Sequence, residues 1–221
     1  MDRGEKMNTI CKLNRDILSY IVKIVKATKK ENVVIKDNTI YAMDYYYNTL
    51  SVAQCYEYES FLPDTFSTTL TSLNYILNSI LKEDMNPIIY LCEHNGMKCL
   101  YYTQTETCIF DDTKILNTIS DAYIRTVVSK SKEPIYSNNL IKDNEEFNRA
   151  LSIKAKDGAT LCKISDGQKN YIMSVFTTIH PITKSDKVTM NIYDEGKTFL
   201  SECIIDKKKY IIYEYIRYLY I

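Results

Sequence analysis

The sequence predicts an α+β protein of two tandem domains, each an antiparallel sheet with helices on one face, the second abbreviated. Two amphipathic helical segments alternate with groups of short strands in the first half, and a similar but shorter series follows in the second half. The 221 residues, 45% of them hydrophobic, are enough for one large or two small domains with a core. We expect the first domain at 8–110, a connector at 111–134 and the second domain at 135–221.

The first helix is expected at 12–30, where KLNRDILSYIVKIVKATKK follows a short strand at 8–13. At about 100° per residue its apolar residues gather on one side, which predicts a core face. The opposite side is almost purely basic and carries Arg15, Ser19, Lys23, Lys26 and Lys30. Such a face is either an ordinary solvated surface or one that meets phosphate, and the helix alone does not distinguish the two.

A hairpin and a further strand are expected after the first helix. The hairpin spans 32–45 and turns at Asp37-Asn38, and the strand spans 49–58. With the elements described next, the first half is predicted to run β-α-β-β-β-α-β-β-β.

The second helix is expected within 60–84 and is entered through Pro63. Its apolar residues keep helical spacing, and its polar side, which includes Lys82, is almost free of carboxylates. The segment 86–110 then predicts a hairpin about Asn95-Gly96 and one more strand, because Asn-Gly is the strongest short hairpin signal.

The second half repeats this pattern in shorter form. A connector at 113–134 with partial helical spacing precedes a strand at 136–141, a helix at 143–158 and a hairpin at 159–176. Strands with a turn at Glu195-Gly196 follow and leave little room for another long helix. The strand-turn-strand unit lies at nearly the same distance from the preceding helix in both halves, which indicates an internal duplication.

The residue types argue against catalysis. The two histidines, His94 and His180, have no recognisable nucleophile partner, and five glycines cannot supply the loops that bind nucleotide phosphates. The spacing of Cys92, His94, Cys99 and Cys108 matches no common zinc pattern, so buried reduced cysteines are expected there. We therefore predict no catalytic residue, no metal site and no cofactor.

Charge and cysteine content indicate the compartment. Lys plus Arg and Asp plus Glu balance at 28 each, so any attraction to nucleic acid has to be local. Seven cysteines without a regular framework, and no apolar run of signal-peptide or membrane length, predict a soluble intracellular protein without a membrane partner. The many Tyr, Ile, Lys and Asn residues suggest an A+T-biased coding sequence, as in many viruses and some bacteria.

The order, spacing and length of these elements resemble the subunit of a DNA polymerase sliding clamp, of the T-even-phage and proliferating cell nuclear antigen type. The stretches that carry the resemblance are KLNRDILSYIVKIV at 12–25, then 33–55 and 56–80, and more weakly 138–153 with 159–179. The resemblance implies the DNA clamp fold with two clamp-like domains per subunit. It further implies a homotrimer joined head-to-tail in a ring whose helices line the hole.

The resemblance also implies a processivity factor that encircles duplex DNA without reading bases, is loaded by a clamp loader and tethers the DNA polymerase. The residues implied to face DNA are Arg15, Lys23, Lys26, Lys30, Lys82, Arg149 and Lys156. The connector residues implied to lie near the groove where polymerase and loader tails dock are Ile115, Leu116 and Ile119.

Two features depart from that family, namely the neutral total charge and a final stretch that is short by a helix or a hairpin. They leave an alternative open, a non-enzymatic viral replication or transcription accessory protein with a clamp-like fold that does not encircle DNA. An enzyme of unrecognised type is the third hypothesis.

Overall fold

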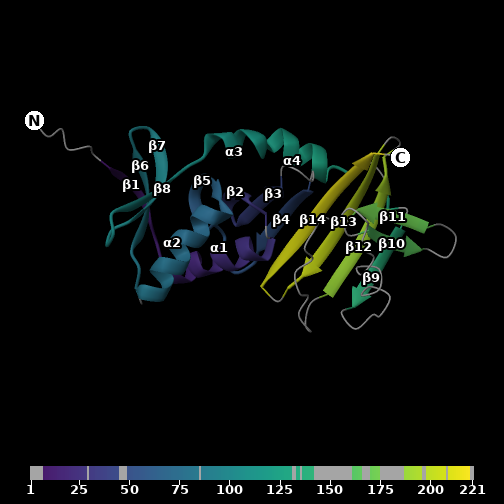
Figure 1. The fold of residues 1–221 in the computed structure, drawn as a ribbon, viewed down its shortest axis with the longest axis horizontal. Coiled ribbons are helices and arrows are strands. Elements are labelled where there is room, and N and C mark those ends of the chain that lie inside the picture. Colours follow the sequence, from purple (N-terminus) through teal and green to yellow (C-terminus); the bar gives the residue numbers. More distant parts are fainter. Residues whose placement is uncertain are drawn as a thin grey trace, which may run out of the picture. The chain divides into compact units, whose positions relative to one another are not determined.

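The computed structural model describes residues 7–28, 30–44, 49–84, 86–130, 133–134, 136–141, 161–165, 170–174, 187–195, 198–207 and 209–219. The chain divides into two compact units, whose helices and strands are labelled in Figure 1. The first unit comprises Met1–Asp44 with Ser51–Thr126, and the second comprises Tyr45–Leu50 with Val127–Ile221. The domain limits expected from the sequence stay a prediction.

Two sets of neighbouring strands build the first unit. Sheet A has the order β1-β6-β7-β8, with β1 at Asn8–Leu13, β6 at Ile89–His94, β7 at Met97–Tyr102 and β8 at Thr107–Phe110. Sheet B denotes the neighbouring strands β5-β2-β3-β4, with β5 at Leu62–Thr69, β2 at Asn32–Asp37, β3 at Thr39–Asp44 and β4 at Thr49–Cys55. The strand pairs with a defined register in both sheets are antiparallel.

Strand β5 corrects the sequence prediction, which placed 62–69 at the entrance of the second helix. The stretch LPDTFSTT forms a strand that pairs with β2, and the helix begins after it. Thr and Phe favour the half-buried surface of a pleated sheet. Thr65, Ser67 and Thr68 are therefore strand residues, while Thr69 ends the strand, and the first unit has one strand more than predicted.

Helices α1, at Arg15–Thr28, and α2, at Leu70–Glu83, are the two predicted amphipathic helices. The apolar side of α1 is buried as expected. Helix α2 is capped by Thr69, whose side-chain oxygen accepts a hydrogen bond from the backbone N–H of Ser72 at 3.0 Å. Both helix predictions are confirmed, although α1 begins at Arg15 and ends at Thr28, whereas the predicted range was 12–30.

The two helices pack side by side and contact strands of sheet B (Figure 1). Arg15 at the start of α1 donates from Nη1 to the backbone oxygen of Asp84, directly after α2, at 3.4 Å. The start of α1 therefore lies beside the end of α2, and the helices run antiparallel. Both leave an outward side that points away from the sheet.

The other face of sheet B carries the connector, which forms helices α3, at Thr113–Thr118, and α4, at Asp121–Val128. Val34 and Tyr41 are paired across β2 and β3, so they share one face, and both line a pocket with residues of these helices. The side chain of Asp112 caps α3 by accepting from the backbone N–H of Lys114 at 2.9 Å. The connector is thus helical, as its partial spacing suggested.

The hairpin of β6 and β7 turns at Asn95-Gly96, as predicted. Both residues have positive φ, 52° and 76°. A two-residue turn of this type requires positive φ at both positions, and Asn and Gly reach it with the least strain. The register places Cys92 directly opposite Cys99.

In the second unit the neighbouring strands run β14-β13-β12-β9. Their bounds are Tyr210–Leu219 for β14, Thr198–Asp206 for β13, Lys187–Asp194 for β12 and Tyr136–Ile141 for β9. A separate antiparallel hairpin joins β10, at Leu161–Ser165, to β11, at Asn170–Ser174. These strands confirm the strand predictions for this half, whereas the predicted helix at 143–158 lies outside the described residues.

Candidate nucleic-acid interface and connector pocket

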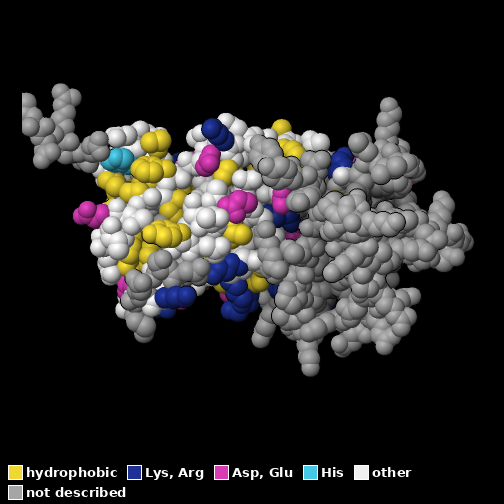
Figure 2. All heavy atoms as spheres, viewed as in Figure 1, with side chains coloured by type: hydrophobic (Ala, Val, Ile, Leu, Met, Phe, Trp, Pro, Cys, Tyr) yellow, Lys and Arg dark blue, Asp and Glu magenta, His cyan; other side chains and the backbone are white. Residues whose placement is uncertain are grey.

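The outward side of α1 and α2 is a candidate nucleic-acid interface, which we call the basic face. It is defined by Arg15, Lys23, Lys26 and Lys82, which are four of the seven residues predicted to face DNA. The three lysines are exposed, and Arg15 is half-buried. Figure 2 shows Lys and Arg side chains gathered where Figure 1 places these helices. The structure thus brings these four positions onto neighbouring helices.

Two acids near the basic face lie at helix starts, and Glu83 and Asp84 lie at the end of α2. Asp16 is in the first turn of α1, where the helix dipole favours a carboxylate. Glu31 accepts a hydrogen bond at Oε1 from the backbone N–H of Thr71, in the first turn of α2, at 3.2 Å. These two carboxylates stabilise helix ends, and the basic side chains dominate the rest of the outward surface among the described residues.

The predicted position of Lys30 is wrong. It was predicted to face DNA, but the residue is only 5% exposed, and Nζ donates to the side-chain oxygen of Ser51 in β4. The reason is that α1 ends at Thr28, so the helical arc that placed Lys30 beside Lys26 does not continue to it. Lys30 therefore belongs to the interior of the first unit.

Arg149 and Lys156 lie outside the described residues. Their expected position facing DNA stays a prediction. The basic face described here belongs wholly to the first unit.

A pocket of about 290 Å³ lies between the connector helices and sheet B; we call it the connector pocket. Its lining residues are Val34, Lys36, Tyr41, Thr65, Leu116, Ile119, Ser120, Asp121 and Ile124. Two of the three predicted partner-binding residues, Leu116 and Ile119, are in this lining. The third, Ile115, is buried and is not part of it.

Polar side chains from β2, β3 and α4 line the connector pocket. Lys36 Nζ lies 3.3 Å from both carboxylate oxygens of Asp121, and the two side chains are 41% and 66% exposed. An ion pair this exposed contributes at most about 1 kcal/mol. Burial raises the pKa of the Tyr41 hydroxyl, and the nearby Lys36 opposes that shift. The pocket thus combines apolar walls with an ion pair that costs little to open.

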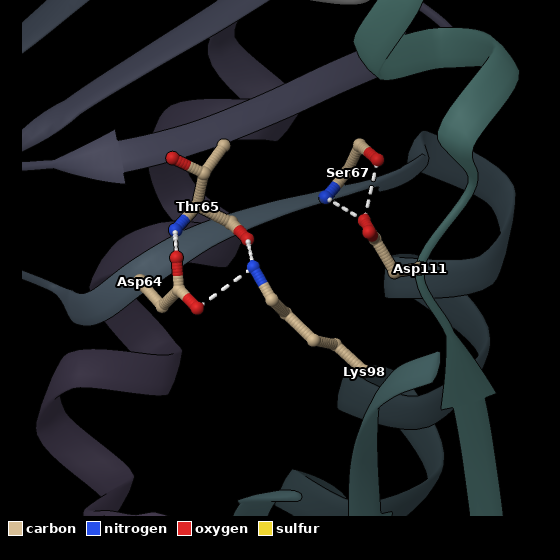
Figure 3. A network of polar contacts seen from close by, with 5 residues as sticks. All are labelled: Asp64, Thr65, Ser67, Lys98 and Asp111. Atoms are coloured by element: carbon tan, nitrogen blue, oxygen red, sulfur yellow. Dashed lines mark hydrogen bonds and ion pairs between the residues drawn. The ribbon is translucent and has the colours of Figure 1, made fainter. Parts of the chain in front are cut away.

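The start of the connector is anchored to β5 by the contacts in Figure 3. Ser67 donates from its backbone N–H to Asp111 Oδ1 at 2.6 Å, and its hydroxyl donates to the same oxygen. Lys98 from β7 donates to the backbone oxygen of Thr65 at 3.0 Å and pairs with Asp64 at 2.8 Å. The hydrogen bond from Lys98 lowers the pKa of Asp64. Because Thr65 lines the connector pocket, these contacts fix one wall relative to α3.

Two cysteines of sheet A lie opposite each other in the hairpin of β6 and β7. Cys92 and Cys99 are buried free thiols. Burial raises the pKa of both, that of Cys99 to about 12, so neither forms much thiolate at neutral pH. In the part of the chain that the structure describes, no group of three or more His, Cys, Asp or Glu is placed to hold a metal ion. His180 is outside that part.

A buried polar cluster lies in the second unit, around Glu202 of β13. The side chain is fully buried and accepts hydrogen bonds from Lys130, from Asn191 Nδ2 at 2.9 Å and from the Tyr193 hydroxyl at 3.1 Å. The ammonium of Lys130 also lies 5.2 Å from the centre of the Tyr193 ring. The carboxylate is enclosed by donors, which is the arrangement of a structural ion pair rather than an open site.

Sequence reasoning missed Lys36, Tyr41 and Asp121 as pocket residues. Lys36 and Asp121 lie 85 positions apart, and no local pattern pairs them. It also passed over Tyr75 on α2, which is strongly exposed beside the basic face. Helical spacing could have found Tyr75, because it falls on the same side of the helix as Lys82.

Comparison with known proteins gives matches in structure and none in sequence. No family model and no curated protein matches the chain. A structure from Eubacterium rectale, described as a DNA polymerase III beta subunit, matches with a TM-score of 0.55 and 12% identity, over 97% of this chain and 65% of that one. The DNA polymerase III subunit beta of Pseudomonas aeruginosa matches with a TM-score of 0.48 and 8% identity, over 96% and 64%. The beta clamp of H. pylori matches with a TM-score of 0.48 and 11% identity, over 100% and 68%.

The chain has the fold of DNA polymerase sliding clamps. The Eubacterium rectale structure carries this conclusion, and it confirms the α+β class and the clamp fold predicted from the sequence. The chain spans less than two thirds of the length of the first two beta subunits, 65% and 64%. No helix among the described residues is long and apolar enough to cross a membrane.

Proposed function

We propose that this protein is a DNA polymerase processivity factor whose subunits form a ring around duplex DNA. The observation that carries the proposal is the basic face, with exposed Lys23, Lys26 and Lys82 on the two helices of a clamp-fold unit. Lysines on a helix surface attract phosphates without contacting base edges, so they hold DNA of any sequence. The protein would therefore slide rather than stop at a site.

In the proposed ring the basic face lines the hole and the sheets form the outer wall. A closed ring is retained on DNA by topology, so that each phosphate contact can be weak. We include Arg15 with the three lysines, and Arg149 and Lys156 as contributions from the second unit. Lys30 is not included, because it is buried. A homotrimer placed on DNA by a clamp loader is the assembly we propose.

The connector pocket is the proposed docking site for segments of the polymerase and the loader. Its walls include Leu116, Ile119 and Ile124, which suit an apolar side chain. The exposed ion pair of Lys36 and Asp121 can open at low cost when such a segment arrives. No residue is assigned a catalytic role.

Light scattering combined with primed-template extension by the polymerase of the same organism tests the proposal. We expect a trimeric mass and longer extension products in the presence of the protein. The double variant Lys23→Ala/Lys26→Ala should keep the trimer and lose most of the stimulation. The matched control is Lys114→Ala, an exposed lysine of α3 outside the basic face, which should leave duplex binding unchanged. A monomer that neither binds duplex nor stimulates extension would favour the accessory protein that does not encircle DNA.

A further inference from the structure

We propose that Tyr75 is a further DNA contact and that its hydroxyl donates a hydrogen bond to a phosphodiester oxygen. This inference rests on the proposed function and adds an uncharged donor to the basic face. Tyr75 is 71% exposed, the largest exposure among the large hydrophobic side chains of the described residues. A single exposed aromatic residue is ordinary on a protein surface, so exposure alone assigns no role to Tyr75.

On α2, Tyr75 shares one side of the helix with Lys82. Seven residues at about 100° each bring the two side chains to within about 20° around the helix axis. Thr71, four residues before Tyr75, is also exposed on this side. Leu73, by contrast, is buried in the core. Tyr75 therefore projects from the same outward stripe as Lys82.

Relative to α1, Tyr75 lies level with the middle of the basic face. The helices are antiparallel, and Arg15 contacts the backbone of Asp84. Tyr75 precedes Asp84 by as many residues as position 24 on α1 follows Arg15. Tyr75 is therefore level with the part of α1 that carries Lys23 and Lys26. Packed helix axes are about 8–10 Å apart, a distance that long side chains from both helices span together.

The chemistry of this position suits a phosphate. The hydroxyl of Tyr is one of the side-chain groups that donate to phosphate oxygens and sugars of DNA. Lys23 and Lys26 bring the phosphate backbone to the surface, and Tyr75 adds a directional donor between the two helices. A neutral donor displaces no counterion, so it should strengthen binding without increasing its salt dependence. The salt dependence of binding therefore distinguishes a phosphate contact by Tyr75 from one by a neighbouring lysine.

The test is equilibrium binding of the full-length protein to a fluorescently labelled DNA duplex, followed by anisotropy over a series of salt concentrations. Tyr75→Phe removes the hydroxyl and keeps the ring. We expect about two- to tenfold weaker binding, as for the loss of one hydrogen bond, and an unchanged salt slope. Lys23→Ala should instead lower the slope by about one. Tyr56→Phe, an exposed tyrosine in the loop after β4, is the matched control and should bind like the wild type.

The outcomes are distinct. Wild-type protein that does not bind duplex overturns the proposed function itself. If wild type binds and Lys23→Ala weakens it, but Tyr75→Phe and Tyr75→Ala both bind like wild type, the assignment of Tyr75 is overturned and the proposed function stands. If Tyr75→Ala weakens binding while Tyr75→Phe does not, the ring makes the contact and the hydroxyl assignment is wrong.

Discussion

The basic face and the connector region of the first unit use positive charge in different ways. On α1 and α2, Lys23, Lys26 and Lys82 are exposed on the outward side of the helices. Around the connector, Lys36 and Lys98 each pair with an aspartate, at 3.3 Å and 2.8 Å. The lysines of the first kind lie on the outward side of two helices, whereas those of the second kind pair with carboxylates of the protein, in an exposed ion pair for Lys36 and a less exposed one for Lys98.

The function of a lysine in this protein follows from what surrounds its ammonium group. Lys30 makes this clear, because it continues the basic pattern of α1 in the sequence yet is buried against Ser51. The total charge of zero hides the same distinction, since it counts both kinds equally. If the distinction is right, changing charges that are paired and buried should affect folding most, and changing those of the basic face should affect DNA binding.

The largest effect on stability is expected in the second unit, from Glu202→Gln. This change leaves Lys130 beside a neutral partner, and removing one member of a buried ion pair costs about 3 kcal/mol of unfolding free energy. DNA affinity measured under folded conditions should be unchanged. Denaturant unfolding checks the prediction, with Glu133→Gln at an exposed position as the matched control. Equal stability of the two variants would remove Glu202 from the group of structural charges.

The same carboxylate predicts a pH dependence. Burial alone would raise the pKa of Glu202, but hydrogen bonds from Lys130, Asn191 and Tyr193 outweigh it and lower the pKa below the ordinary value of 4.5. A lowered folded-state pKa stabilises the protein above the unfolded-state pKa, and this stabilisation is lost as pH falls through the folded-state pKa. Wild-type unfolding free energy should therefore fall more steeply than that of Glu202→Gln below about pH 4.5.

A smaller loss is expected from Asp111→Ala at the connector. The substitution removes the acceptor of two hydrogen bonds from Ser67, which should cost about 1–2 kcal/mol because the β5 backbone N–H loses its partner. Thermal unfolding measures this loss. Binding of a polymerase-derived peptide to the connector pocket should also weaken, since α3 loses an anchor. A variant that unfolds like wild type would show that Asp112, which caps α3, suffices to hold the connector.

The smallest effect is expected from Asp121→Asn at the rim of the connector pocket. The ion pair with Lys36 is exposed, so the unfolding free energy should change by less than about 0.5 kcal/mol. Duplex affinity should also stay the same, although the variant has one negative charge fewer. If Asp121→Asn raised duplex affinity by as much as Lys23→Ala lowers it, the charges of the connector region would act on DNA as those of the basic face do. The two regions would then not differ.

Local patterns predicted most of the elements. The apolar spacing of α1 and the Asn95-Gly96 turn were recognised because each depends on neighbouring residues, and both are confirmed. Strand β5 was missed because Ser and Thr serve both as helix caps and as strand residues, and its pairing with β2 decides between them. Lys30 was misplaced because the periodicity does not mark where a helix ends.

The sequence predicted the two parts of the candidate site, the basic face and the connector pocket, to different extents. The exposed lysines of α1 and α2 follow from helical geometry within each segment. The connector pocket depends on the packing of α3 and α4 against β2, β3 and β5, so only Leu116 and Ile119 were anticipated and the rim was not. The contact of Lys36 with Asp121 joins distant parts of the chain, and a single sequence holds no local signal for it.

The salt dependence of duplex binding is the decisive measurement for the assignment of the basic face to DNA. The triple variant Lys23→Ala/Lys26→Ala/Lys82→Ala should bind duplex more weakly than wild type. The slope of log affinity against log salt should fall by about three, since each lysine neutralises about one phosphate. A slope equal to that of wild type, in a variant that is folded and keeps the same oligomeric state, would contradict the assignment of this face to DNA.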